Sequence, residues 1–135
     1  MAVKVLGINH IGIAVENLEA AKKLYCEKLG FTLLEEKRLE DRKVTVAFLE
    51  AGSTTIELLE GIGEDSPITK FVAKRGQGIH HICYEVEDIE KTIAKYINKG
   101  IELIDKEAKP GAEGKPVAFL HPRSTNGVLL EIMQA

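Results

Sequence analysis

The 135-residue sequence has no tryptophan, only two cysteines, and aromatic residues make up 5% of it. Cys26 and Cys83 cannot form the disulfide framework of a small secreted domain, so we expect a cytoplasmic location. Few aromatic rings are present to stack on bases, and the charges, net −3, are interspersed. No nucleic-acid partner is therefore expected. The chain also lacks an apolar signal core and any apolar run approaching the ~20 residues of a membrane span, so we expect no membrane association.

What the sequence does contain is an internal repeat. Residues 46–49, Val-Ala-Phe-Leu, recur at 117–120, and residues 15–19 match 86–90. An apolar share of 44% and a charged share of 29% are typical of a soluble globular protein of this length. The simplest explanation is an α+β fold in which two βαβββ modules follow each other. We therefore expect one domain over residues 1–135, with module 1 at about 5–60, a connector at 61–77 and module 2 at about 78–135.

Periodicity and capping residues predict the elements of each module. Asn17, Ser66 and Asp88 are suitable N-cap residues for three helices. Strands are expected at 3–15, Phe31–Leu34, Val44–Leu49 and Thr54–Leu59, then at 79–86, Ile101–Ile104, Val117–Leu120 and Val128–Met133. Helices are expected at Leu18–Lys28, after Ser66, and at Ile89–Asn98.

Two adjacent histidines, His80 and His81, lie in one predicted strand. Successive side chains of a strand point to opposite faces, so only one of them can occupy the face that His10 occupies in the first module. The repeat pairs His10 with His81, and we expect His80 to be a packing or hydrogen-bonding residue on the other face.

The same alignment pairs Glu57 with Glu131, each with apolar neighbours on both sides. Burying a carboxylate is costly unless it is paired or bound to a metal. If the two modules face each other, their curved mixed sheets form a cup-like cleft in which His10, Glu57, His81 and Glu131 hold a divalent cation. A lone strand histidine is more often a core residue, and a lone glutamate is usually exposed. Because all four residues occupy matching positions of the repeat, we favour a metal site over these two alternatives.

These residues resemble the vicinal oxygen chelate (glyoxalase) superfamily, whose paired βαβββ modules carry a His…Glu…His…Glu set. Within it the chain is similar to the methylmalonyl-CoA epimerases along nearly its whole length. The stretches that carry the resemblance are residues 9–15, 64–68, 74–82 and 117–131.

The resemblance implies an enzyme that interconverts (R)- and (S)-methylmalonyl-CoA by removing the α-proton and forming a metal-stabilised enolate. It implies that His10, Glu57, His81 and Glu131 are metal ligands, with Glu131 and Glu57 as catalytic acid–base candidates. Co²⁺ is the favoured ion, and Zn²⁺, Ni²⁺ and Mn²⁺ are compatible. The implied partner is a small acyl-CoA, and the implied assembly is a homodimer.

The chain departs from the family pattern on one strand. Some members have glutamine at the position of Glu57 and a second catalytic glutamate on the preceding strand, where this chain has Val46. The second acid–base group therefore stays open, with Glu57 as one choice. The candidate substrate contacts are His121, Arg123, Ser124 and Lys115. Side chains of these types more often lie at the surface without a ligand.

Two other functions remain open on these residues. A lactoylglutathione lyase uses a similar ligand set, and the stretches 64–78 and 109–115 favour the epimerase over it. A metal-free protein that binds a small molecule in the same cleft has little need for paired buried His and Glu. A ring-cleaving dioxygenase, with two histidines and one carboxylate from one module, fits a ligand set split between modules poorly.

Overall fold

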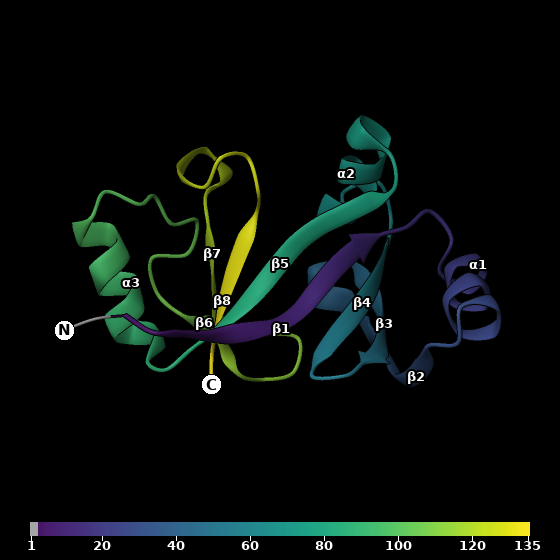
Figure 1. Ribbon diagram of the computed structural model, residues 1–135. Coiled ribbons are helices and arrows are strands. Elements are labelled where there is room, and N and C mark those ends of the chain that lie inside the picture. The colour runs from purple at the N-terminus through teal and green to yellow at the C-terminus, as the bar shows by residue number, and fades with distance from the viewer. Residues whose placement is uncertain (1–2) are drawn as a thin grey trace. The chain divides into compact units, whose positions relative to one another are not determined.

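The computed structural model describes residues 3–135, which form an α+β fold of two βαβββ modules joined by a helix (Figure 1). The predicted fold class is confirmed. The first module comprises β1 (Val5–Ala14), α1 (Leu18–Lys22), the π-helical turn η1 (Lys23–Lys28), β2 (Thr32–Leu39), the 3-10 turn η2 (Glu40–Arg42), β3 (Val44–Ala51) and β4 (Thr54–Gly61). After the connecting helix α2 (Pro67–Arg75), the second comprises β5 (Gly78–Val86), α3 (Ile89–Asn98), β6 (Lys109–Pro110), β7 (Pro116–Leu120), the 3-10 turn η3 (Pro122–Ser124) and β8 (Leu130–Gln134).

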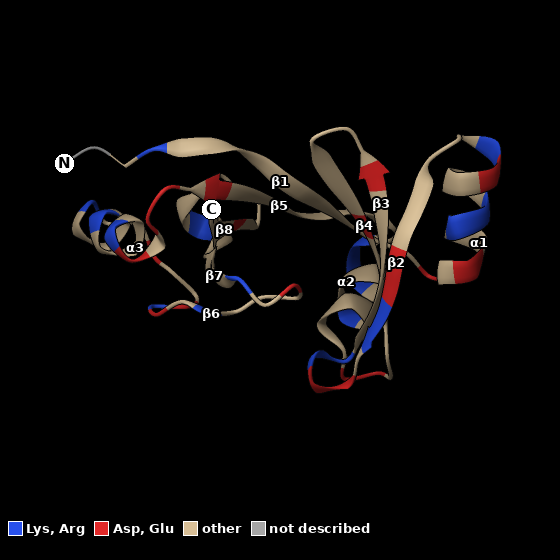
Figure 2. Cartoon of the chain, turned by 90° about the horizontal axis from the view of Figure 1, so that it is seen from below, with Lys and Arg blue, Asp and Glu red and all other residues tan. Residues whose placement is uncertain are grey.

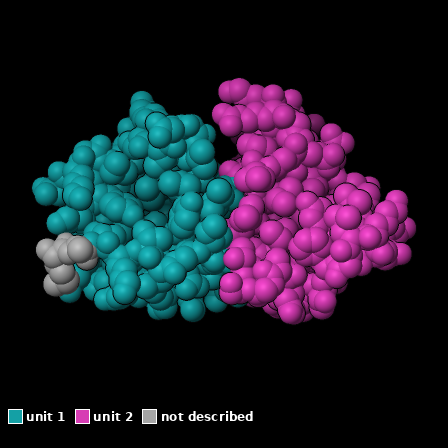
Figure 3. Space-filling view, in the orientation of Figure 1, with its two compact units in different colours: residues 1–9, 81–135 teal, residues 10–80 magenta. Residues whose placement is uncertain are grey.

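The chain separates into two compact units, coloured in Figure 3. One unit is His10–His80, which holds the first module from the middle of β1 onwards together with α2. The other is His81–Ala135, which holds the second module, together with the residues up to Asn9. Each unit has a hydrophobic cluster of its own.

The strands of the first module have the order β2-β3-β4-β1, in which β1 and β4 are parallel and the other pairs antiparallel. The second module repeats this arrangement as β6-β7-β8-β5, with β5 and β8 as the parallel pair. In both modules the first strand therefore lies beside the last one. A helix connects strands one and two of each module, as a crossover connection requires.

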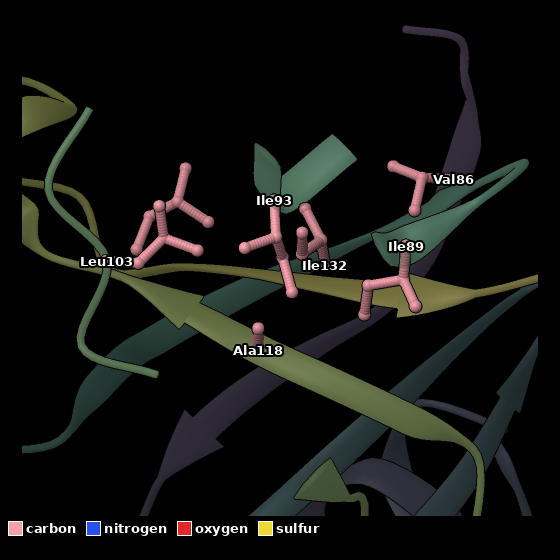
Figure 4. Close-up of a cluster of buried hydrophobic side chains, with 7 residues drawn as sticks. Val86, Ile89, Ile93, Leu103, Ala118 and Ile132 are labelled. Atoms are coloured by element: carbon pink, nitrogen blue, oxygen red, sulfur yellow. The ribbon is translucent and has the colours of Figure 1, made fainter. Parts of the chain in front are cut away.

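One face of each sheet is covered by the helix of its own module. In the second module, Ile89 and Ile93 of α3 pack on Val86, Ala118 and Ile132 of the sheet (Figure 4). In the first module the equivalent cluster is Val15, Leu18, Ala47, Leu49 and Leu58. Because strand side chains alternate, the residues between these, among them His10, Phe48, Glu57, His81 and Glu131, lie on the opposite face. We call this opposite face the ligand face of each module.

The caps predicted for the helices are present. The side chains of Asn17, Ser66 and Asp88 accept hydrogen bonds from Ala20 N, Ile68 N and Lys91 N. The predicted helix Leu18–Lys28 is helical throughout, although its second half is π-helical. Lys22 of α1 contacts Glu19 at 2.8 Å and Glu36 of β2 at 2.6 Å, and hydrogen bonds to these carboxylates raise the pKa of Lys22.

Two strand predictions need correction. Ile101–Ile104 is not a strand: only Leu103 forms a bridge, to Leu120, and its side chain fills the core cluster beside α3. The short strand β6 lies instead between Leu103 and β7, where no strand was predicted. Strand β2 extends beyond Leu34 through four charged residues (Figure 2), because an edge strand tolerates charged side chains in solvent.

Among residues 3–135, no helix is long and apolar enough to cross a membrane.

Candidate metal half-sites

Each module carries one buried His–Glu pair on its ligand face. In the first module, His10 Nδ1 of β1 lies 3.2 Å from Glu57 Oε2 of β4. In the second, His81 Nε2 of β5 lies 3.3 Å from Glu131 Oε1 of β8. The residues are only 4–6% exposed, so both pairs are largely removed from water. We call the two pairs the His10–Glu57 and His81–Glu131 half-sites.

Strand register places each pair in the same way. Glu57 lies opposite Gly12, two residues after His10, and Glu131 lies opposite Cys83, two residues after His81. Residues two apart on a strand share a face, so the imidazole and the carboxylate point to the same side of the parallel pair. A slip of one residue in either parallel pair would turn the carboxylate to the helix-covered face.

A phenylalanine from the Val-Ala-Phe-Leu repeat flanks each carboxylate on its other side. Phe48 of β3 lies opposite Glu57, and Phe119 of β7 lies opposite Glu131. The Phe119 ring also meets the His81 ring edge-on, with centroids 5.6 Å apart. These rings restrict solvent beside the donor atoms, which strengthens electrostatic interactions there.

A lysine lies over each of these two rings. The sequence analysis did not predict this repeated contact. Lys37 Nζ is 5.8 Å from the Phe48 ring centroid, and Lys109 Nζ is 5.7 Å from that of Phe119. Lys37 pairs with Val46 of β3, and Lys109 pairs with Val117 of β7, its repeat equivalent. The sequence carries no regular signal for these lysines, because Lys37 precedes Val46 by nine residues and Lys109 precedes Val117 by eight; their equivalence depends on strand register, and β6 was not predicted as a strand.

His80 occupies a different environment from His81. It alternates onto the other face of β5, and its ring packs edge-on against Phe71 of α2 with centroids 5.0 Å apart. This contact agrees with the expected packing role of His80. Cys83 is fully buried and packs with Val117 and Met133, so it is a core residue of the second module.

The predicted substrate-contact residues lie around the start of β7 and the turn after it. His121 Nδ1 accepts a hydrogen bond from Arg123 N at 3.1 Å, and Arg123 Nε lies 3.1 Å from Glu102 Oε1. Ser124 Oγ accepts from Glu102 N at 2.9 Å, and Lys115 is exposed. A substrate role for these residues stays a prediction.

Strand β3 supplies no buried carboxylate beside Glu57. Val46 is 1% exposed, and Glu50, the only carboxylate of this fully described strand, is exposed. Glu40, in η2, forms an ion pair with Arg38. Glu57 is therefore the buried carboxylate of the first module's ligand face.

The donors of the half-sites suit a divalent cation of borderline hardness better than a hard ion. They also differ from those of a closed structural zinc site. Each half-site offers one neutral imidazole nitrogen and one anionic carboxylate, donors that suit divalent cations. Closed structural zinc sites are usually built from thiolates, and neither cysteine belongs to a half-site.

The chain resembles known proteins over nearly its whole length. Residues 9–119 match the sequence profile of the Glyoxalase/Bleomycin resistance protein/Dioxygenase superfamily. The chain is 46% identical to the ethylmalonyl-CoA/methylmalonyl-CoA epimerase of Cereibacter sphaeroides, over 94% of this chain and 96% of the relative. It is 43% identical to the mitochondrial methylmalonyl-CoA epimerase of Homo sapiens, over 95% of this chain and 73% of the relative. A solved structure of methylmalonyl-CoA epimerase in complex with methylmalonyl-CoA and NH4+ superposes with a TM-score of 0.91 at 33% identity, covering 98% of this chain and 96% of the other.

Proposed function

The chain belongs to the Glyoxalase/Bleomycin resistance protein/Dioxygenase superfamily, and we propose that it is an isomerase that epimerises methylmalonyl-CoA with the help of a divalent metal. One observation carries the proposal: each module holds a buried His–Glu pair in the same strand register. The relatives named methylmalonyl-CoA epimerase, which match nearly the whole chain, support the choice of substrate.

We assign His10, Glu57, His81 and Glu131 as the ligands of one cation, with each module contributing one half-site. Two carboxylates offset the charge of a divalent ion, and two imidazoles favour a borderline metal such as Co²⁺. Zn²⁺, Ni²⁺ and Mn²⁺ are compatible with the same donors. When bound, such an ion supplies Lewis-acid stabilisation of the negative charge that develops on the thioester oxygen.

The residues of the chain then have to move a proton from one face of the α-carbon to the other. We assign this proton transfer to Glu131 and Glu57. One carboxylate accepts the α-proton as the C–H bond breaks, and the other carboxyl group delivers a proton to the opposite face. Both side chains are buried, so water competes little for these protons. The proton gained by the first group is returned in the reverse reaction or exchanged with solvent.

The substrate carries a carboxylate and the phosphates of CoA, so cations should surround its path. Lys37 and Lys109 occupy repeat-related positions on the ligand faces, and His121, Arg123, Ser124 and Lys115 remain candidate contacts. We propose that Lys109 attracts the anionic substrate, because its ammonium is half exposed yet lies over the ring beside Glu131.

The proposal includes a homodimer in the cytoplasm. Val5, Leu6 and Ile8 at the start of β1 are 40–50% exposed, and a second copy of the chain would cover this apolar segment. In that reducing compartment the thiols of Cys26 and Cys83 would stay reduced.

The decisive experiment follows exchange of the α-proton of methylmalonyl-CoA in deuterated water, with and without a chelator. We expect exchange that the chelator abolishes and that added Co²⁺ restores. Absence of chelator-sensitive exchange would refute the proposal. Turnover of the hemithioacetal of glutathione in its place would identify a lactoylglutathione lyase, and purified protein devoid of metal affinity would indicate a binding protein.

A further inference from the structure

A second repeat-related contact lies three residues beyond each ligand carboxylate. Glu60 follows Glu57 on β4, and its Oε1 accepts a hydrogen bond from the backbone N–H of Leu18, the first residue of α1, at 2.6 Å. Gln134 follows Glu131 on β8, and its Oε1 accepts from the N–H of Ile89, the first residue of α3, at 2.9 Å. Different side chains, Glu and Gln, thus make the same bond at equivalent positions.

Each of these bonds links the end of the carboxylate-bearing strand to the helix that follows the histidine-bearing strand. We call this bond the helix tie of the module. The helix continues directly from the strand that bears the histidine, through the turn at Asn17 or Asp88. The strand that bears the carboxylate returns beside it, and its end is tied to the first helical N–H. In the second module the tie is double, because Gln134 Nε2 also donates to the carbonyl of Glu87, in the turn before α3, at 2.8 Å.

The helix tie lies close to the residues whose strand register aligns the half-site. Val86 lies opposite Gln134 in the β5–β8 pair, three positions from the Cys83–Glu131 pair that aligns the half-site. Parallel strand pairs are held by slanted hydrogen bonds that are slightly weaker per residue than antiparallel ones. A side chain that fixes the ends of both strands to one helix therefore restricts both sliding and splaying at the half-site.

We propose that Glu60 and Gln134 are positioning residues, which hold the carboxylates of Glu57 and Glu131 in register with His10 and His81. A purely structural role would make them ordinary helix caps. Each helix also has such a cap, which provides a matched control: Asn17 Oδ1 accepts from Ala20 N, and Asp88 Oδ1 accepts from Lys91 N, both at 3.0 Å. Neither control residue is on the carboxylate strand.

The first test uses the metal-free protein and therefore does not depend on the proposed function. The chain has four histidines, so the imidazole nitrogen signals of His10 and His81 can be assigned by NMR. Glu60→Ala should shift the signals of His10 and leave those of His81 in place, whereas Gln134→Ala should do the reverse. Asn17→Ala and Asp88→Ala should shift neither, and Glu60→Gln, which keeps the acceptor oxygen, should restore the His10 signals.

The second test measures divalent-metal affinity by competition with a chelator, and in this respect the inference rests on the proposed function. Loss of a residue that orients a ligand typically weakens metal binding about tenfold or more, so we expect this for Glu60→Ala and Gln134→Ala but not for the cap controls.

Equal effects of Glu60→Ala and Asn17→Ala on the histidine signals would overturn the proposal, as would failure of Glu60→Gln to restore the His10 signals. If Glu60→Ala does not fold, Gln134→Ala decides. Shifts in the histidine signals without any epimerase activity would leave this inference standing and refute the proposed function alone.

Discussion

Phe119 lies directly opposite Glu131 in the antiparallel pair β7–β8. The ring covers one side of a carboxylate that His81 contacts on the other. Phe48 stands in the same relation to Glu57 in the first module. The repeated Val-Ala-Phe-Leu thus serves two purposes, since its Ala and Leu side chains pack under the helix while its Phe shields a half-site.

Replacing His81 by alanine should remove metal and activity together. His81 is buried against Glu131, so its loss deletes a donor and should weaken metal binding by more than the ~100-fold that loss of an outer-shell partner can cost. His80→Ala is the control and should retain the metal, because His80 packs on Phe71. Metal content by elemental analysis is the measurement, and the opposite pattern would place His80 in the site.

Glu57→Gln should abolish epimerisation while leaving metal bound. The amide keeps a donor oxygen and the shape of the side chain but cannot accept the substrate proton, so the rate should fall by about 10²–10⁴-fold. Glu50→Gln makes the same chemical change at an exposed position of β3 and should be neutral. The α-proton exchange assay measures both, and full activity of Glu57→Gln would show that Glu57 is not an acid–base group.

Lys109→Met should raise KM for methylmalonyl-CoA and leave kcat almost unchanged. Lys109 is half exposed and paired with Asp105 at 3.1 Å, so its attraction for the substrate should be worth about 1 kcal/mol, roughly fivefold in KM. The difference should shrink as salt is added. Lys106→Met, at an exposed position just before β6, should match the wild type. An unchanged KM would remove Lys109 from the substrate path.

Gly61→Ala should lower the free energy of unfolding by about 1–3 kcal/mol through overpacking. A Cβ at Gly61 would lie 2.7 Å from both Thr69 N and Ser66 Oγ of the α2 start, and backbone cannot move aside easily. Gly78→Ala is the matched control, because nothing lies within 4 Å of its Cβ position. Urea denaturation followed by circular dichroism gives both values, and equal stabilities would contradict the close approach of α2 to β4.

The order of elements could be predicted from the sequence because it depends on local patterns. Alternating apolar residues identify most strands, and Asn17, Ser66 and Asp88 identify helix starts since their side chains satisfy nearby N–H groups. The repeat then pairs His10 with His81 and Glu57 with Glu131. Where a local pattern was ambiguous the prediction failed: in the stretch 101–104, Leu103 and Ile101 pack in the core beside α3, and no strand forms.

The tertiary structure decided what distant residues do to one another. Strand register placed Glu57 opposite Gly12 and Glu131 opposite Cys83, which brings each carboxylate to its histidine. It also set Lys37 and Lys109 over the phenylalanine rings, and it tied Glu60 and Gln134 to the helix starts. Composition and periodicity indicate which residues suit the buried or the exposed face of an element. Which of them meet depends on the pairing of strands separated by a whole helix, and only the folded chain specifies that pairing.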